Sequence, residues 1–125
     1  MSIKIRNMVK GEELPNSLTV GFEKGNQPEW IWIAERDGKP VAILIAAPAH
    51  IVAMLLRVAS TPEAEWSDVR TLLVNALAEI KSRGFEGYVT WIDPNGEIEK
   101  KILQIILAHG GVKLPMPMFF CIGRC

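Results

Sequence analysis

The stretch WIWIAERDGKPVAILIA, residues 30–46, decides the fold of this chain. Two runs rich in β-branched and aromatic residues, Trp30–Ala34 and Val41–Ala46, flank the pair Asp37-Gly38. An Asp-Gly pair between two such runs is the strongest short-range signal of a β-hairpin. The stretch therefore predicts two neighbouring antiparallel strands.

A third strand is expected after this hairpin. Pro48 and His50 mark a break, and the run Ile51–Ala59 that follows is apolar almost throughout. Continuous apolar character is typical of a strand that is buried on both faces. We therefore expect helices on both sides of the sheet.

The best-defined element is a helix near residues 62–83. Thr61-Pro62-Glu63 is typical of a helix start, with a hydroxyl N-cap and proline at the first helical position. Gly84 follows as the stop signal. Six apolar residues fall on one face at helical spacing, namely Val69, Leu72, Leu73, Ala76, Leu77 and Ile80.

The remaining elements complete one domain over residues 1–125. Ile3–Met8 predicts an opening strand, Tyr88–Ile92 a further strand, and residues 96–109 a second helix. Met118–Ile122 predicts the closing strand. This order predicts an α/β (α+β) fold, with a mixed, mostly antiparallel sheet flanked by two main helices.

The composition excludes several classes of function. The formal net charge is zero, and no basic run is longer than two residues, so we expect neither a nucleic acid nor a membrane as partner. No apolar run reaches about 18 residues, and the opening residues do not resemble a signal peptide. On an extended chain the Cα atoms of Cys121 and Cys125 would lie roughly 13 Å apart, which is too far for a disulfide. We therefore expect a cytoplasmic protein without a metal site.

From Trp30 onward, the order of elements resembles the core of the GNAT N-acetyltransferase superfamily. The segment AERDGKPVAILIAA is similar to the family's central hairpin, and LLVNALAEIKSRGFEGYVTWI to its cofactor-side helix and next strand. IKIRNM resembles the opening strand. Two helices normally follow, and here they are reduced to Val9–Glu29. About fourteen residues follow Gly111, where full-length members have two strands. The chain therefore resembles a trimmed version of the fold.

The resemblance implies a coenzyme A site at the start of the main helix, where the family has an Arg/Gln-x-x-Gly-x-Gly/Ala loop. Glycines there let backbone amides approach the pyrophosphate. The corresponding segment Thr61–Val69 has no glycine, and none occurs between Gly38 and Gly84. The acids of this segment either repel phosphate or stabilise the helix start. The residues of the degenerate loop are Glu63, Glu65, Trp66, Ser67 and Asp68. We expect no cofactor, and acetyl-CoA only if this loop binds it in an atypical way.

Catalytic candidates are few. Leu107 stands where the family often has a proton-donating tyrosine. Glu35, beside the hairpin turn, is a candidate base acting through water, and His50 is a candidate general base. Tyr88 is the only tyrosine. Each has a structural alternative, as a solvated surface group or as a strand residue.

The last candidates concern binding to protein. Trp66 either packs under the helix, plugs the cofactor cleft or anchors a partner. The tail is strongly apolar, and its residues Leu114, Met116 and Met118 are candidates for an interface.

Three functions stay open. The first is a GNAT-like domain that has lost acyl-CoA binding and acts as a protein-binding or structural module, with another protein or a second copy as partner. Such trimmed folds resemble accessory and virion-associated proteins of tailed phages, which would place a phage-encoded chain in the virion. The second is an acyl-CoA-dependent N-acetyltransferase with an atypical phosphate loop. The third is a sensor of a small ligand.

Overall fold

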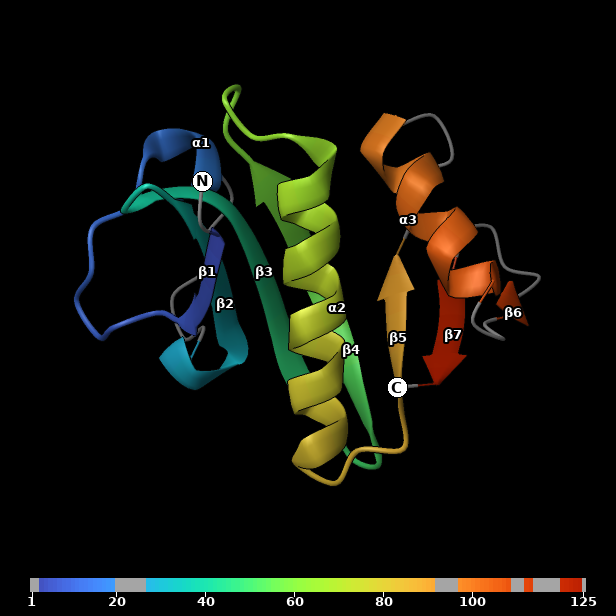
Figure 1. The fold of residues 1–125 in the computed structure, drawn as a ribbon. Helices are drawn as coiled ribbons and strands as arrows, with labels where there is room; N and C mark the ends of the chain where they lie inside the picture. The colour runs from blue at the N-terminus through green and yellow to red at the C-terminus, as the bar shows by residue number, and fades with distance from the viewer. Residues whose placement is uncertain (1–2, 20–26, 92–96, 109–111, 114–119, 125) are drawn as a thin grey trace.

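A computed structural model describes residues 3–19, 27–91, 97–108, 112–113 and 120–124 (Figure 1). In these residues, seven strands form one sheet in the order β1-β2-β3-β4-β5-β7-β6. Only β4 and β5 pair in parallel. The strands are β1 (Ile3–Asn7), β2 (Ile31–Arg36), β3 (Lys39–Ala49), β4 (Val52–Ser60), β5 (Gly87–Trp91), β6 (Val112–Lys113) and β7 (Phe120–Arg124). The helices are α1 (Asn16–Thr19), the 3-10 turn Pro28–Trp30, α2 (Trp66–Ser82) and α3 (Glu97–Ala108). The predicted fold class is confirmed.

The hairpin of β2 and β3 forms where the sequence predicts it. Asp37 and Gly38 adopt φ values of 52° and 80°. Both values lie in the left-handed region, which the two central residues of a type I′ hairpin turn require. The strands pair from Ile31↔Ile45 to Arg36↔Lys39, with a register shift after Ala34.

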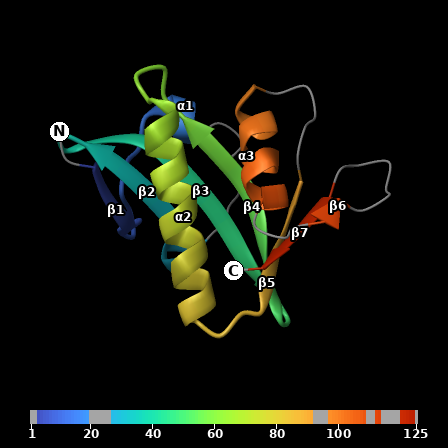
Figure 2. The same cartoon turned by 45° about the vertical axis from the view of Figure 1, so that its right-hand side comes forward.

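The sheet separates two apolar clusters. α2 and α3 lie on one face (Figures 1 and 2) and pack on the larger cluster, which includes Trp32, Leu44, Leu72 and Ile106. α1 covers the other face through Leu18, which packs on Ile31, Ile33, Ile43 and Ile45. Helices thus cover both faces, but unequally. None of the helices in the described ranges is both long enough and apolar enough to cross a membrane.

The expected burial of the third strand on both faces is wrong for β4. Ala53 and Leu55 are buried under α2 and α3, whereas Leu56 is 44% exposed and Met54 is half-buried. The four-residue α1 is too short to cover this part of the opposite face. The strands buried on both faces are β2, over Ile31–Ala34, and β3, over Val41–Ala46.

The start of α2 also differs from the prediction. Thr61 is not the N-cap, because its backbone N–H donates to Val41 O at 2.8 Å and so continues the contact of β4 with β3. Glu65 is the N-cap, with extended φ and ψ of −98° and 158°, and the helix begins at Trp66. Tertiary pairing with β3 therefore overrides the local start signal at Pro62.

The C-terminal part contains one strand more than the sequence predicts. β6 pairs with β7, and β7 pairs with β5. The single predicted strand Met118–Ile122 corresponds to β7, which the structure places at Phe120–Arg124.

Candidate functional site

The site that the sequence singles out, the start of α2, is formed by three elements. The end of β2 supplies Arg36, the segment after β4 supplies Glu65, and the first turn of α2 supplies Asp68. Arg36 Nη2 donates to Asp68 Oδ2 at 2.5 Å, and its Nη1 lies 3.3 Å from Glu65 Oε1. The backbone N–H of Glu65 donates to Asp68 Oδ2 at 2.9 Å. We call these three residues the Arg36 cluster.

Burial and charge make Asp68 the centre of this cluster. Its side chain is 0% exposed, and that of Arg36 is 15% exposed. The hydrogen bond to Asp68 is the largest influence on the pKa of Arg36, which it raises, and the bond to Glu65 adds to it. One guanidinium thus compensates one of the two carboxylate charges. The alternative that the acids stabilise the helix start holds for Glu65 and Asp68. Glu63 is exposed.

The cluster occupies the helix N-terminus with a group from the chain itself. A helix N-terminus attracts an anion through its unpaired amides and its dipole. Here the anion is the carboxylate of Asp68, which lies in the first turn and accepts the backbone N–H of the N-cap. An external phosphate at this position would meet a buried carboxylate and the exposed acids Glu63 and Glu65.

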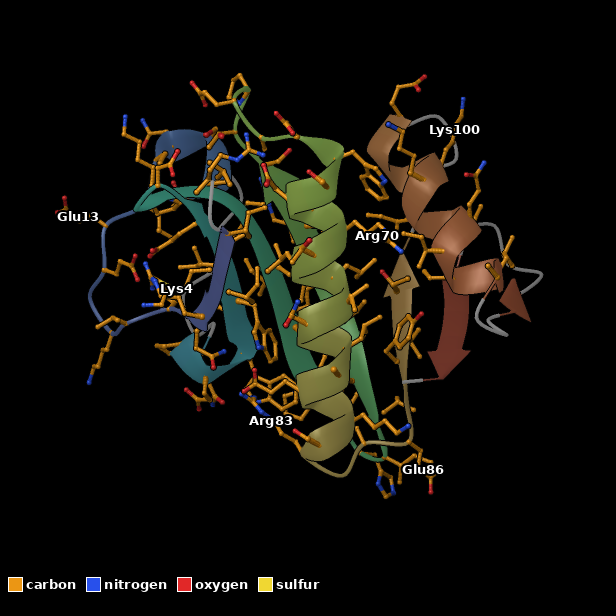
Figure 3. The ribbon with its side chains drawn as sticks, viewed as in Figure 1. Lys4, Glu13, Arg70, Arg83, Glu86 and Lys100 are labelled. Atoms are coloured by element: carbon orange, nitrogen blue, oxygen red, sulfur yellow. The ribbon has the colours of Figure 1, made fainter. Side chains whose placement is uncertain are left out.

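Trp66 lies between the starts of α2 and α3. It is partly buried and packs on the larger cluster, and Lys101 of α3 places Nζ 5.4 Å from the centre of its ring. Arg70, one turn further along α2, is exposed and points toward α3 (Figure 3). Of the three interpretations of Trp66, packing at the helix start agrees best with this geometry.

Strands β4 and β5 run together for only part of their length. Their pairing extends from Val52↔Gly87 to Leu55↔Thr90. β4 continues to Ser60, paired with β3 alone in the described part of the chain. The exposed Leu56 stands at the point where the two strands separate.

The structure does not bring the catalytic candidates together. Glu35 forms an ion pair with Arg6 of β1 on the α1 face, so its carboxylate is already bound. Tyr88 is 2% exposed, in the core beneath α2 and α3. His50 is exposed at the tip of the β3–β4 hairpin, with φ of 62°.

Arg6 also binds a second carboxylate. It donates to Glu12 at 2.8 and 2.5 Å, and this hydrogen bond is the main reason why the pKa of Glu12 is lowered and that of Arg6 raised. Glu35 therefore belongs to an ion network on β1 and β2 and does not reach the start of α2. Leu107 is 47% exposed on α3.

Other predicted residues fall outside what can be described. Leu114, Met116 and Met118 lie outside the described residues, as does Cys125, and the side chain of Cys121 is not described either. Across the described ranges, no three His, Cys, Asp or Glu side chains gather as metal ligands would.

Sequence reasoning missed Arg36. It stands next to the Asp-Gly turn, where a charged residue is ordinary, and its partner Asp68 lies 32 residues away. The spacing in the chain contains no signal for this pair. Only the return of β4 along β3 brings the end of β2 beside the start of α2.

No protein-family model and no curated protein matches the sequence. Solved structures match it over nearly its whole length. The PaiA N-acetyltransferase of Thermoplasma acidophilum, in complex with coenzyme A, aligns with a TM-score of 0.72 and 15% identity, covering 100% of both chains. The ribosomal-protein-S18-alanine N-acetyltransferase of Escherichia coli aligns with a TM-score of 0.74 and 14% identity, covering 98% of this chain and 94% of the other. A GNAT family acetyltransferase of Elizabethkingia anophelis with bound acetyl-CoA aligns with a TM-score of 0.73 and 12% identity, covering 98% of each chain. The chain therefore has the GNAT fold, and identities this low establish the fold alone.

Proposed function

We propose that this GNAT-fold domain does not bind acyl-CoA and acts as a protein-binding or structural module. One observation carries the proposal: the Arg36 cluster places the carboxylate of Asp68, fully buried and hydrogen-bonded, at the N-terminus of α2. A phosphate would have to displace a carboxylate that already has both a cation and a backbone amide as partners. The missing glycines support the same conclusion, because a β-carbon stands at every position of Thr61–Val69.

The candidate catalytic groups that the structure describes lie apart from one another, which supports this function as well. Glu35 is bound to Arg6, Tyr88 is buried, and His50 lies at a hairpin tip. A domain with this fold and without its cofactor retains large surfaces for other proteins. Its partner would be another protein or a second copy of this chain. As a structural module, the domain would form part of an assembly such as a virion.

The proposal is tested by thermal unfolding with acetyl-CoA. A ligand that binds only the folded state with a Kd of about 10 μM adds about 2.7 kcal/mol of stability at about 1 mM. For 125 residues this corresponds to an increase in Tm of about 10 °C. We expect no measurable shift. The Thermoplasma PaiA N-acetyltransferase, whose crystal structure contains coenzyme A, serves as the positive control.

A saturable increase in Tm with acetyl-CoA, confirmed by calorimetric titration, would contradict the proposal. Parallel titrations with desulfo-coenzyme A and with ATP would show whether the protein recognises the whole cofactor or only its phosphates. A shift with ATP alone would indicate a weak polyphosphate site and would leave the proposal standing.

The second candidate is an acyl-CoA-dependent N-acetyltransferase with an atypical phosphate loop. The separation of β4 from β5 beyond Leu55 favours it, together with the exposed cations Arg70 and Lys101 beside the start of α2. In that case acetyl-CoA would stabilise the protein, and release of free thiol from acetyl-CoA would depend on an amine substrate. Loss of this activity in R70A/K101A, with no loss in K4A/K39A, would assign the phosphate contacts to the two helices.

A further inference from the structure

Arg57 of β4 lies on the α1 face of the sheet. It stands opposite Ile45 of β3, and cross-strand partners share a face. Ile45 belongs to the smaller apolar cluster, which Leu18 of α1 covers, and Ala59 packs on the same cluster two residues after Arg57. The guanidinium is therefore on the opposite side of the sheet from α2 and α3 (Figures 1 and 2).

Arg57 has no partner for its charge in the part of the chain that the structure describes. It is half-buried, and its Nε is buried without a hydrogen bond. No ion pair among the described residues includes it. Arg6 and Arg36, by contrast, each contact two carboxylates. A guanidinium that leaves water costs free energy unless a counter-charge or hydrogen bonds replace its hydration, so the burial of Arg57 is not compensated as that of the other two is.

The elements around Arg57 contain no acid that could pair with it. α1, β3, β4 and β5 have no Asp or Glu in their sequences, and their only other charged residue is Lys39, at the start of β3. Glu13 precedes α1 and projects beyond β1 at the edge of the molecule (Figure 3). Glu86 precedes β5 and lies beside Ile51, six residues before Arg57 or roughly 20 Å along the strand.

Other acids are bound elsewhere or lie past the end of β4. Glu12, Glu35 and Glu65 contact other arginines. Glu63 is exposed beyond the end of β4, six residues after Arg57, and forms no ion pair in the described ranges. The described chain therefore supplies no negative charge for Arg57.

The same face is apolar on the side of Arg57 toward the start of β4. Met54 lies opposite Ala47 of β3 and Val89 of β5. Because Ala46 packs in the larger cluster, its neighbour Ala47 and the residues in register with it face the α1 side. Met54 and Val89 are half-buried, and neither belongs to or packs on either apolar cluster.

Arg57 and Met54 are neighbours on this face. Their β3 partners Ile45 and Ala47 stand two residues apart, a spacing of roughly 7 Å. We call Arg57, Met54 and Val89 the Arg57 site. It joins an unpaired cation to an apolar surface, at the border of the area that α1 covers.

We propose that the Arg57 site binds a carboxylate that is attached to an apolar group. A guanidinium can donate two parallel hydrogen bonds to one carboxylate. Met54 and Val89 would contact the apolar group at the same time. A nucleic acid needs several clustered cations, whereas the elements around Arg57 offer only Lys39 besides. The inference goes beyond the proposed function and does not depend on it, because the site and the start of α2 lie on opposite faces of the sheet.

Methyl NMR of the full chain tests this binding. Met54 is one of five methionines, so 13C-methyl labelling places one of five signals in the site, and Met54→Leu assigns it. Hexanoate should shift the Met54 signal saturably. Hexanamide, which lacks the charge, and acetate, which lacks the apolar chain, should each bind about tenfold more weakly or worse. A tripeptide that ends in leucine, as the free acid and as the amide, shows whether a protein carboxylate binds more tightly than a free acid.

Variants at two cations locate the binding. R57Q should weaken hexanoate binding by about tenfold or more, and R57K should weaken it less, because the ammonium keeps the charge but loses the paired donors. K39Q removes the other cation of these elements and should bind within about twofold of wild type. R57M removes an unpaired guanidinium but keeps an apolar side chain, so its Tm should equal or exceed that of wild type.

Four results would overturn the inference. They are no saturable shift with hexanoate or the peptide acid, equal affinity for hexanamide, equal losses in R57Q and K39Q, and a Tm of R57M well below that of wild type. The last result would show that Arg57 serves the fold by covering apolar surface with its stem. The ligand series uses the wild-type chain, so it decides the question even if a variant fails to fold.

Discussion

Arg36→Met should destabilise the fold far more than an ordinary surface substitution. Methionine keeps the length and the apolar stem of the arginine but removes the cation that Asp68 Oδ2 contacts at 2.5 Å. Asp68 then stays fully buried, with the Glu65 amide as the only described partner of Oδ2. Its other oxygen, Oδ1, has no hydrogen-bond partner in the described part of the chain.

The magnitude follows from this geometry. Removing one partner of a buried ion pair costs about 3–5 kcal/mol. The lower end, about 3 kcal/mol, applies here because Arg36 is 15% exposed, so that water can reach part of the vacated space. For 125 residues this lowers the Tm by about 10 °C. Asp68→Asn should cost less, about 1–2 kcal/mol, because the amide oxygen can still accept from Glu65 and Arg36 keeps its contact with Glu65.

Urea unfolding followed by circular dichroism gives the free energies of unfolding. Lys39→Met, at an exposed cation on the same hairpin, is the matched control and should lie within about 0.5 kcal/mol of wild type. The double variant R36M/D68L should be less destabilised than the sum of R36M and D68L, since neither charge is then left alone. If R36M were as stable as K39M, the Arg36 cluster would not hold the start of α2, and the argument against phosphate binding would lose its support.

Two further substitutions test other parts of the structure. Burial raises the pKa of Glu79, but hydrogen bonds from Trp32 and Arg83 outweigh this effect, so the pKa in the folded state lies below the ordinary value of 4.5. The stability that Glu79 contributes is therefore present above pH 4.5. It is lost as the pH falls through the folded-state pKa. Glu79→Gln should thus cost about 1 kcal/mol of stability at pH 7, a value that allows for a side chain that is 42% exposed. Urea titrations should show the difference in stability between the variant and wild type shrinking below about pH 4.5. A difference that stays constant with pH would contradict the assignment. Gly38→Ala should cost about 1 kcal/mol through backbone conformation alone, because φ is 80° and an added Cβ meets nothing within 4 Å, and an unchanged Tm would show that the turn relaxes freely.

The fold was predictable because its signals are local. Asp37-Gly38 between two β-rich runs specifies a hairpin whatever surrounds it, and the turn forms there. The apolar spacing from Val69 to Ile80 specifies a helix with one buried face, and Val69, Leu72, Leu73, Ala76 and Ile80 are indeed buried. Both signals lie within a few residues of the chain, so the sequence alone determined the two central strands and the main helix.

The candidate site was predictable only in part, since the acids of Thr61–Val69 are visible in the sequence but their partner is not. The structure decided that Arg36 neutralises Asp68, that Glu35 is bound by Arg6, and that Thr61 continues β4 instead of capping α2. Each of these contacts joins residues that are distant in the chain, and their pairing depends on the register and order of the strands. The sequence by itself determined the central hairpin and the main helix, and that no glycine stands in Thr61–Val69. Only the tertiary structure decided where each charge finds its partner, because a buried charge is stabilised by whatever the fold places within a few ångströms of it.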